Sequence, residues 1–245
     1  MKKIFKKSVI MFMSITVIMV ASSVSVHADV DVPNMKTSSL PTSYTEANGE
    51  QSLDNMLNTV ANNIDINTKD QTIDIEDSTQ LADSISQNDV DNINFLSASE
   101  GLPANLTKQS IVSTFSSHIN TLNNELHSGK YTVQSNGELV NSSDSNFYVQ
   151  GGVTKDIIYW WGKKRYKSTY ATNLWIDKLN SAAALNAGAA SVAGIVLSGV
   201  VATPNGITSA YTWKLASDIS YVNHRSNRGV VANITWTLTY TIRKQ

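Results

Sequence analysis

Cationic and aromatic side chains are concentrated in one short segment of the chain, and together they have the chemistry of a contact with an anionic surface. Ammonium and guanidinium groups attract phosphate-bearing headgroups, and tryptophan rings are enriched where a membrane meets water. The members of this basic–aromatic cluster are Trp160, Trp161, Lys163, Lys164, Arg165 and Lys167. The cluster predicts a membrane or partner contact.

Residues that could carry catalysis or hold a metal are scarce. The chain has no cysteine, and beyond residue 28 its histidines are His118, His127 and His224. His118 and His127 are nine positions apart, so a helix would place them on different faces. The sequence contains no nucleophile elbow, phosphate-binding glycine loop or dinucleotide fingerprint. We therefore expect a protein that is not an enzyme and that uses no metal and no cofactor.

A stretch from Leu179 to Trp213 carries no charged residue. Small residues recur in it at spacings of four, and we expect them to form the packing face of a helical hairpin. These residues are Ala184, Gly188, Ala190, Gly194 and Ser198. In lipid such a face brings helices together, and in water it lets two helices of one domain approach closely. A span needs about 20 predominantly apolar residues, and the polar residues in this stretch weaken direct insertion.

Apolar periodicity predicts the elements that must position these residues. An amphipathic helix is expected within 103–128, ended by Gly129. Its apolar stripe is formed by Ile111, Phe115, Ile119, Leu122 and Leu126. Asn136-Gly137 predicts a hairpin between 131–133 and 138–140, because this dipeptide accepts positive φ angles.

Two strands are expected, at 153–161 and 230–242, and they should pair as neighbours. The second alternates apolar residues with threonine and polar residues throughout. A pore strand with water-lining threonines would give the same alternation, but a half-buried strand of a soluble domain is the favoured interpretation. Between the strands we expect antiparallel helices at 173–201, capped by Thr172, and at 207–222, joined by a turn at 204–206.

Composition divides the chain into three parts. Residues 1–28 have the charged start, apolar core and small-residue cleavage site of a secretory signal peptide. Residues 29–100 hold fourteen acidic and two basic residues and few aromatics, so we expect a largely disordered acidic segment, with weak helix near 51–64. Residues 101–245 hold thirteen basic and six acidic residues and are expected to form a compact domain.

The predicted fold class is therefore α+β. It consists of a small antiparallel sheet with a helical hairpin and an N-terminal amphipathic helix, preceded by a disordered acidic tail.

Three short motifs carry a resemblance. The segment Gly151-Gly152-Val153-Thr154-Lys155, the run Trp160-Trp161-Gly162 and the later Arg228-Gly229-Val230 flank the Ala/Gly-rich hydrophobic stretch. In this arrangement residues 105–245 resemble a loose group of small secreted proteins of Gram-positive bacteria, some of them bacteriocin-like. The resemblance implies secretion and supplies no catalytic residues.

Two functions remain open from the sequence. The first is a secreted, bacteriocin-like or membrane-active protein whose basic–aromatic cluster touches an anionic membrane and whose hairpin is conditionally exposed. The alternative is a cell-envelope binding or structural module, in which the cluster binds a cell-wall polymer or a partner and the hairpin is ordinary core. Self-association is compatible with both. Nucleic acid is not an expected partner, because the cationic run is short and the chain carries an export signal.

Overall fold

The computed structural model describes residues 45–141, 147–149, 152–185, 189–197 and 207–245, which all belong to one unit spanning 41–245. Its helices are α1 (Glu46–Ala61), α2 (Ser78–Ser84), α3 (Gln87–Ser99), α4 (Lys108–His127), α5 (Thr169–Ala184), α6 (Ala189–Leu197) and α7 (Ser209–His224). Its strands are β1 (Ile64–Asn67), β2 (Thr72–Ile75), β3 (Tyr131–Val133), β4 (Glu138–Asn141), β5 (Phe147–Val149), β6 (Gly152–Tyr159), β7 (Gly162–Lys167), β8 (Val230–Thr235) and β9 (Tyr240–Lys244). The predicted α+β class is confirmed.

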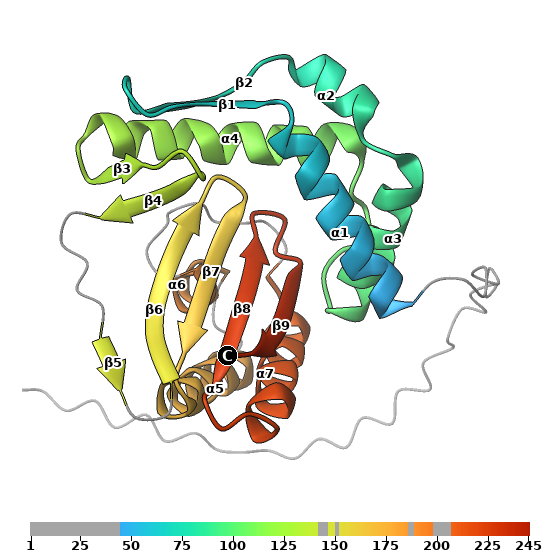
Figure 1. The fold of residues 1–245 in the computed structure, drawn as a ribbon. Coiled ribbons are helices and arrows are strands. Elements are labelled where there is room, and N and C mark those ends of the chain that lie inside the picture. Colours follow the sequence, from blue (N-terminus) through green and yellow to red (C-terminus); the bar gives the residue numbers. More distant parts are fainter. Residues whose placement is uncertain (1–44, 142–146, 150–151, 186–188, 198–206) are drawn as a thin grey trace, which may run out of the picture. The chain divides into compact units, whose positions relative to one another are not determined.

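An antiparallel sheet in the order β3-β4-β6-β7-β8-β9 forms the centre of the unit, and β5 pairs with β6 beside it. Helices α5 and α7 lie together beside this sheet, whereas α4 crosses the tips of the β6–β7 and β8–β9 hairpins (Figure 1). The side chain of Asn223 near the end of α7 donates to Asn173 near the start of α5, at 2.9 Å. The two helices therefore run antiparallel.

The amphipathic helix expected within 103–128 is confirmed as α4. Thr107 caps its start by accepting a hydrogen bond from the Ser110 N–H, and all five residues of its predicted apolar stripe are buried. Gly129 ends the helix with a φ of +73°. The hairpin of β3 and β4 is also confirmed, with Gly137 at a φ of +78°.

The prediction of disorder is wrong for residues 45–100, which form α1, β1, β2, α2 and α3. Aliphatic side chains of these elements are buried in the same core as α4 and the sheet. Polar side chains fasten them to it: the Asn123 amide accepts from the Ile73 N–H at 2.9 Å and donates to the Ile73 carbonyl at 2.8 Å. The composition of this segment led to the wrong prediction because it does not show the spacing of the few aliphatic residues. At helical spacing these residues are enough to form a core together with α4.

The single strand expected at 230–242 is also wrong: β8 and β9 form a hairpin with a turn at residues 236–239. The alternation persists across the turn because Ile234 pairs with Tyr240 and Ala232 with Ile242, which keeps residues of even number on one face. Thr235 and Thr239 are buried and bonded to each other, so they line no water. Strand β7 separates β6 from β8, so the two expected strands are not neighbours.

The helical stretch differs from its prediction as well. Helix α5 begins at Thr169, because Ser168 rather than Thr172 is its N-cap, and a separate α6 replaces the expected continuation to residue 201. Ala184 and Gly194 are exposed and do not form a packing face. Gly188, Ser198 and the 204–206 turn lie outside the described residues, as does the Ala190 side chain. No helix among the described residues is both long and apolar enough to span a membrane.

Candidate functional site

The basic–aromatic cluster is divided between the two faces of the sheet, because β7 lies between β6 and β8 and its side chains alternate. Lys163 and Arg165 point inward and are 3% and 5% exposed. Lys164 lies on the other face, 5.4 Å above the ring of Tyr166. The two buried cations cannot make the first contact with a membrane, which corrects the prediction for them.

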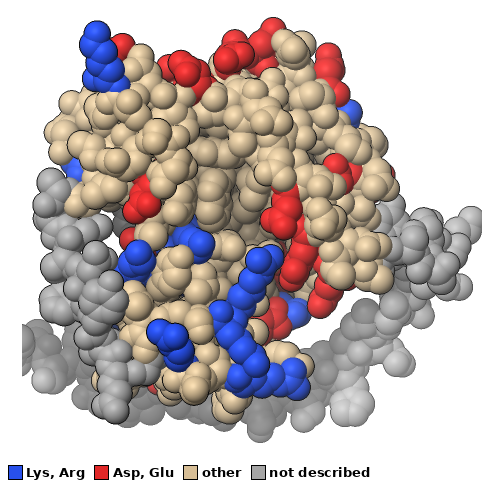
Figure 2. Space-filling model, in the orientation of Figure 1, with Lys and Arg blue, Asp and Glu red and all other residues tan. Residues whose placement is uncertain are grey.

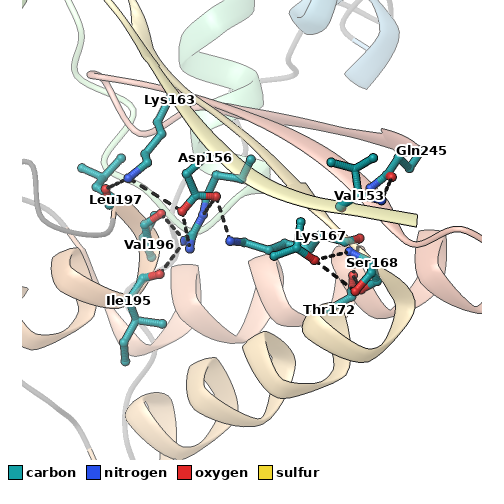
Figure 3. A network of polar contacts seen from close by, with 12 residues as sticks. Val153, Asp156, Lys163, Lys167, Ser168, Thr172, Ile195, Val196, Leu197 and Gln245 are labelled. Carbon is teal, nitrogen blue, oxygen red and sulfur yellow. Dashed lines mark hydrogen bonds and ion pairs between the residues drawn. The ribbon is translucent and has the colours of Figure 1, made fainter. Parts of the chain in front are cut away.

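A network of ion pairs holds the inward-facing cations around one carboxylate (Figure 3). Asp156 of β6 lies 2.8 Å from the Lys167 ammonium, 3.3 Å from the Arg165 guanidinium and 3.8 Å from the Lys163 ammonium. Asp156 is thus the one acidic member of a cluster that holds three bases. The sequence analysis did not single out Asp156, because the sequence alone does not show which cations a carboxylate on a strand will pair with.

The C-terminal turn of α6 neutralises part of the remaining positive charge. The Lys163 ammonium donates to the Leu197 carbonyl at 2.8 Å, and the Arg165 guanidinium donates to the Ile195 and Val196 carbonyls at 2.6 and 2.7 Å. The last carbonyls of a helix have no partner within the helix and carry partial negative charge. The buried cations therefore fasten α6 to the sheet.

The pKa values in the network show which forces dominate. Burial acts to raise the pKa of Asp156, but the charges of Arg165, Lys167 and Lys163 together outweigh it and hold this pKa below its usual range. Burial lowers the pKa of Lys167, and the neighbouring Arg165 lowers it further, against the attraction of Asp156. Ionised Asp156 is therefore the shared counter-charge of these cations inside the protein.

The two tryptophans of the cluster form the turn between β6 and β7, and they differ in exposure. Trp160 is buried, and its ring centroid lies 5.9 Å from that of Phe115 in α4. Its carbonyl accepts a hydrogen bond from the indole of Trp236 at 2.5 Å. Trp161 is half-buried and stacks on Tyr159, with 5.1 Å between the ring centroids. The prediction of an interfacial Trp160 is therefore wrong, since this ring belongs to the core.

A cavity of about 310 Å³ opens beside the network, between β7, α5 and α6. Arg165, Lys167 and Lys178 supply its charged lining, and Trp175 forms one wall. The Arg165 guanidinium stacks over the Trp175 ring at 4.3 Å, and the indole N–H of Trp175 has no hydrogen-bond partner among the described residues. The lining of the cavity contains three cations and no carboxylate, so the cavity suits an anion.

The outer face of α5 continues from this cavity. Tyr170, Leu174 and Leu185 are 72%, 45% and 80% exposed, and Lys178 lies among them. Tyr170, Leu174 and Lys178 follow one another at spacings of four, so they form one stripe. We call this set the α5 face. This spacing can be found in the sequence, but the sequence does not show which side of the helix is exposed to solvent.

Among the described residues, no group of three or more histidines and carboxylates is placed to hold a metal ion. Comparison with protein families, curated proteins and solved structures finds no match for this chain. The arguments about function therefore rest on the chain's own geometry.

Proposed function

We propose that this is a secreted, non-enzymatic protein that binds anionic membrane surfaces through the α5 face, with a headgroup phosphate in the cavity beside it. The observation that carries the proposal is the exposed Leu174–Lys178 pair directly bordering a cavity lined by Arg165 and Lys167. The proposed contact therefore lies on a neighbouring helix and not on the predicted basic–aromatic cluster, of which Lys167 is the more exposed cation in the cavity lining.

The energetic argument combines two modest terms. Each lysine or arginine near an anionic bilayer contributes about 1 kcal/mol, and the effect fades within a Debye length. Tyr170, Leu174 and Leu185 add apolar area that is now in water, at about 25 cal/mol per Å² when it is buried. Single exposed apolar residues are ordinary on protein surfaces. Their alignment with a cationic cavity is what favours a membrane.

Co-sedimentation with vesicles tests the proposal. The protein should bind vesicles containing phosphatidylglycerol and should not bind vesicles of phosphatidylcholine alone. Lys178→Glu should weaken this binding several-fold because it reverses a charge at the cavity rim. Leu185→Asp should weaken it through the apolar term. Lys69→Glu is the matched control, because Lys69 is also exposed but lies between β1 and β2.

Binding that is equal for the two vesicle types, or that falls as much in Lys69→Glu as in Lys178→Glu, contradicts the proposal. A dye-leakage assay on the same vesicles extends it from binding to bacteriocin-like membrane disruption. Disruption would need α6 to leave the buried cations, so leakage should be lost when α6 is cross-linked to β7.

A phosphate-bearing cell-wall polymer is the second candidate ligand. The favouring observation is that the cavity alone could hold a phosphate group without help from Leu185, which is not part of its lining. The two candidates differ in one variant: Leu185→Asp should weaken vesicle binding but leave polymer binding unchanged, whereas Lys178→Glu should weaken both.

A further inference from the structure

Carboxylates from three separate parts of the chain converge on a second cavity, of about 490 Å³. Glu46 and Glu50 come from α1, Glu100 follows α3, and Asp218 comes from α7. Lys214 is the one base in its lining among the described residues. Figure 2 shows acidic side chains gathered on the molecular face in the region of α1 and β9. The sequence offers no hint of this convergence, because the four acids span 172 positions.

Glu100 is the residue that marks this cavity as more than a group of surface acids. It is 2% exposed, and its Oε1 accepts from the Tyr240 N–H at 3.2 Å, while its buried Oε2 has no partner among the described residues. Glu100 also caps the C-terminus of α3, where the helix carbonyls disfavour a negative charge. An unpaired buried carboxyl costs free energy that a purely structural side chain would avoid.

The groups around Glu100 add to the free-energy cost of ionising its carboxyl. Burial raises the pKa of Glu100 well above its ordinary value, and Asp218 raises it further, against the hydrogen bond from the Tyr240 amide. Asp218 itself is well supported, since it accepts from the Tyr240 hydroxyl at 2.8 Å and from Lys214 at 2.7 Å. The cavity therefore pairs a satisfied carboxylate with an unsatisfied one. Neighbouring carboxyl groups of which one has a strongly shifted pKa are typical of binding and reaction sites.

The remaining lining indicates the shape of a ligand. Leu96, Val222 and Ile242 supply apolar side chains, and Tyr221 is 58% exposed. The Arg225 guanidinium lies 3.8 Å from the centroid of the Tyr221 ring, which shows that this ring can contact a cation. Such a lining accommodates a cationic group on a short alkyl chain.

We propose that this cavity binds an alkylammonium group, with the ammonium against the free Glu100 oxygen and its chain along the apolar wall. A small diamine and a lysine side chain of a peptide share this chemistry. The Lys214 ammonium already adopts the corresponding arrangement with Asp218. The proposal is independent of membrane binding, which uses the α5 face and a different cavity.

Isothermal titration with 1,5-diaminopentane and with tetralysine tests the proposal and separates the two sources. Both probes should bind the full chain, and glutarate, of similar length and opposite charge, should not. Stronger binding of tetralysine identifies a peptide source, and stronger binding of the diamine a small-molecule source. Glu100→Gln should weaken the preferred probe about tenfold, which corresponds to about 1.4 kcal/mol.

A matched pair on one helix keeps the test decisive even where the Glu100 variant folds poorly. Glu50→Gln should weaken binding several-fold, whereas Asp54→Asn, one turn further along α1 and outside the cavity, should leave it unchanged. Binding should also release a proton from the wild-type chain, seen as a buffer-dependent heat, and Glu100→Gln should abolish this release. Absence of saturable binding up to about 10 mM, or equal losses in Glu50→Gln and Asp54→Asn, overturns the proposal.

Discussion

His118 is buried in α4, where its ring stacks on that of Trp236 with 4.5 Å between centroids. Burial lowers its pKa to about 4, so the imidazole is neutral in the folded protein at neutral pH. The unfolded chain takes up this proton near pH 6.5 and the folded chain only near pH 4, so stability contributed by His118 is lost as pH falls between these values. The full loss is about 3 kcal/mol. His118→Phe keeps a stacking ring and removes the proton, so the free energies of unfolding of variant and wild type in urea should diverge by that amount from pH 7 to pH 4.

Asp156 is the second residue whose removal has a defined consequence. Asp156→Asn leaves Lys163, Arg165 and Lys167 without their shared carboxylate in a largely buried site. Breaking one partner out of a buried ion-pair network costs about 3–5 kcal/mol, and the loss should be seen in urea unfolding at neutral pH. Asp177→Asn, at an exposed position of α5, is the control and should change stability by less than about 0.5 kcal/mol. Equal effects of the two substitutions would show that the network contributes nothing specific.

At the scale of elements, two glycines differ in whether the fold has room for a side chain at their position. Gly194 was expected to let helices approach, yet a Cβ there would meet no atom within 4 Å. Gly194→Ala should therefore stabilise α6 by about 0.5–1 kcal/mol through helix propensity. Gly162 has a φ of +154°, and a Cβ there would lie 2.1 Å from the Ile234 carbonyl oxygen. Gly162→Ala should thus lower the thermal midpoint, while Gly194→Ala raises it; the reverse order would contradict the placement of both.

The same scale shows why some elements could be predicted and others could not. The α4 stripe and the Asn136-Gly137 turn follow from local spacing alone, and both are confirmed. Lys163-Lys164-Arg165 has no local pattern, because cations occupy both faces of β7 and only Asp156 and the α6 carbonyls decide which of them is inside. Alternation over 230–242 likewise continues through a hairpin turn, so side-chain parity cannot distinguish one strand from two.

At the scale of the whole molecule, residues 45–100 and 101–245 are predicted to be one folding unit. The first part packs through α2 and β2 against α4, whose apolar stripe is buried, and Glu100 and Gln71 bond the backbone of Tyr240 and Val133 in the second part. A chain spanning 101–245 exposes that stripe, and each large apolar side chain returned to water costs about 1.5–3 kcal/mol, which exceeds the stability of an ordinary domain after a few residues. It should bind a hydrophobic dye and unfold without a cooperative urea transition, whereas the chain spanning 41–245 should unfold cooperatively. A cooperative transition in the shorter chain, with near-ultraviolet circular dichroism like that of the longer one, would show that the acidic half is an addition to a complete domain and not part of its core.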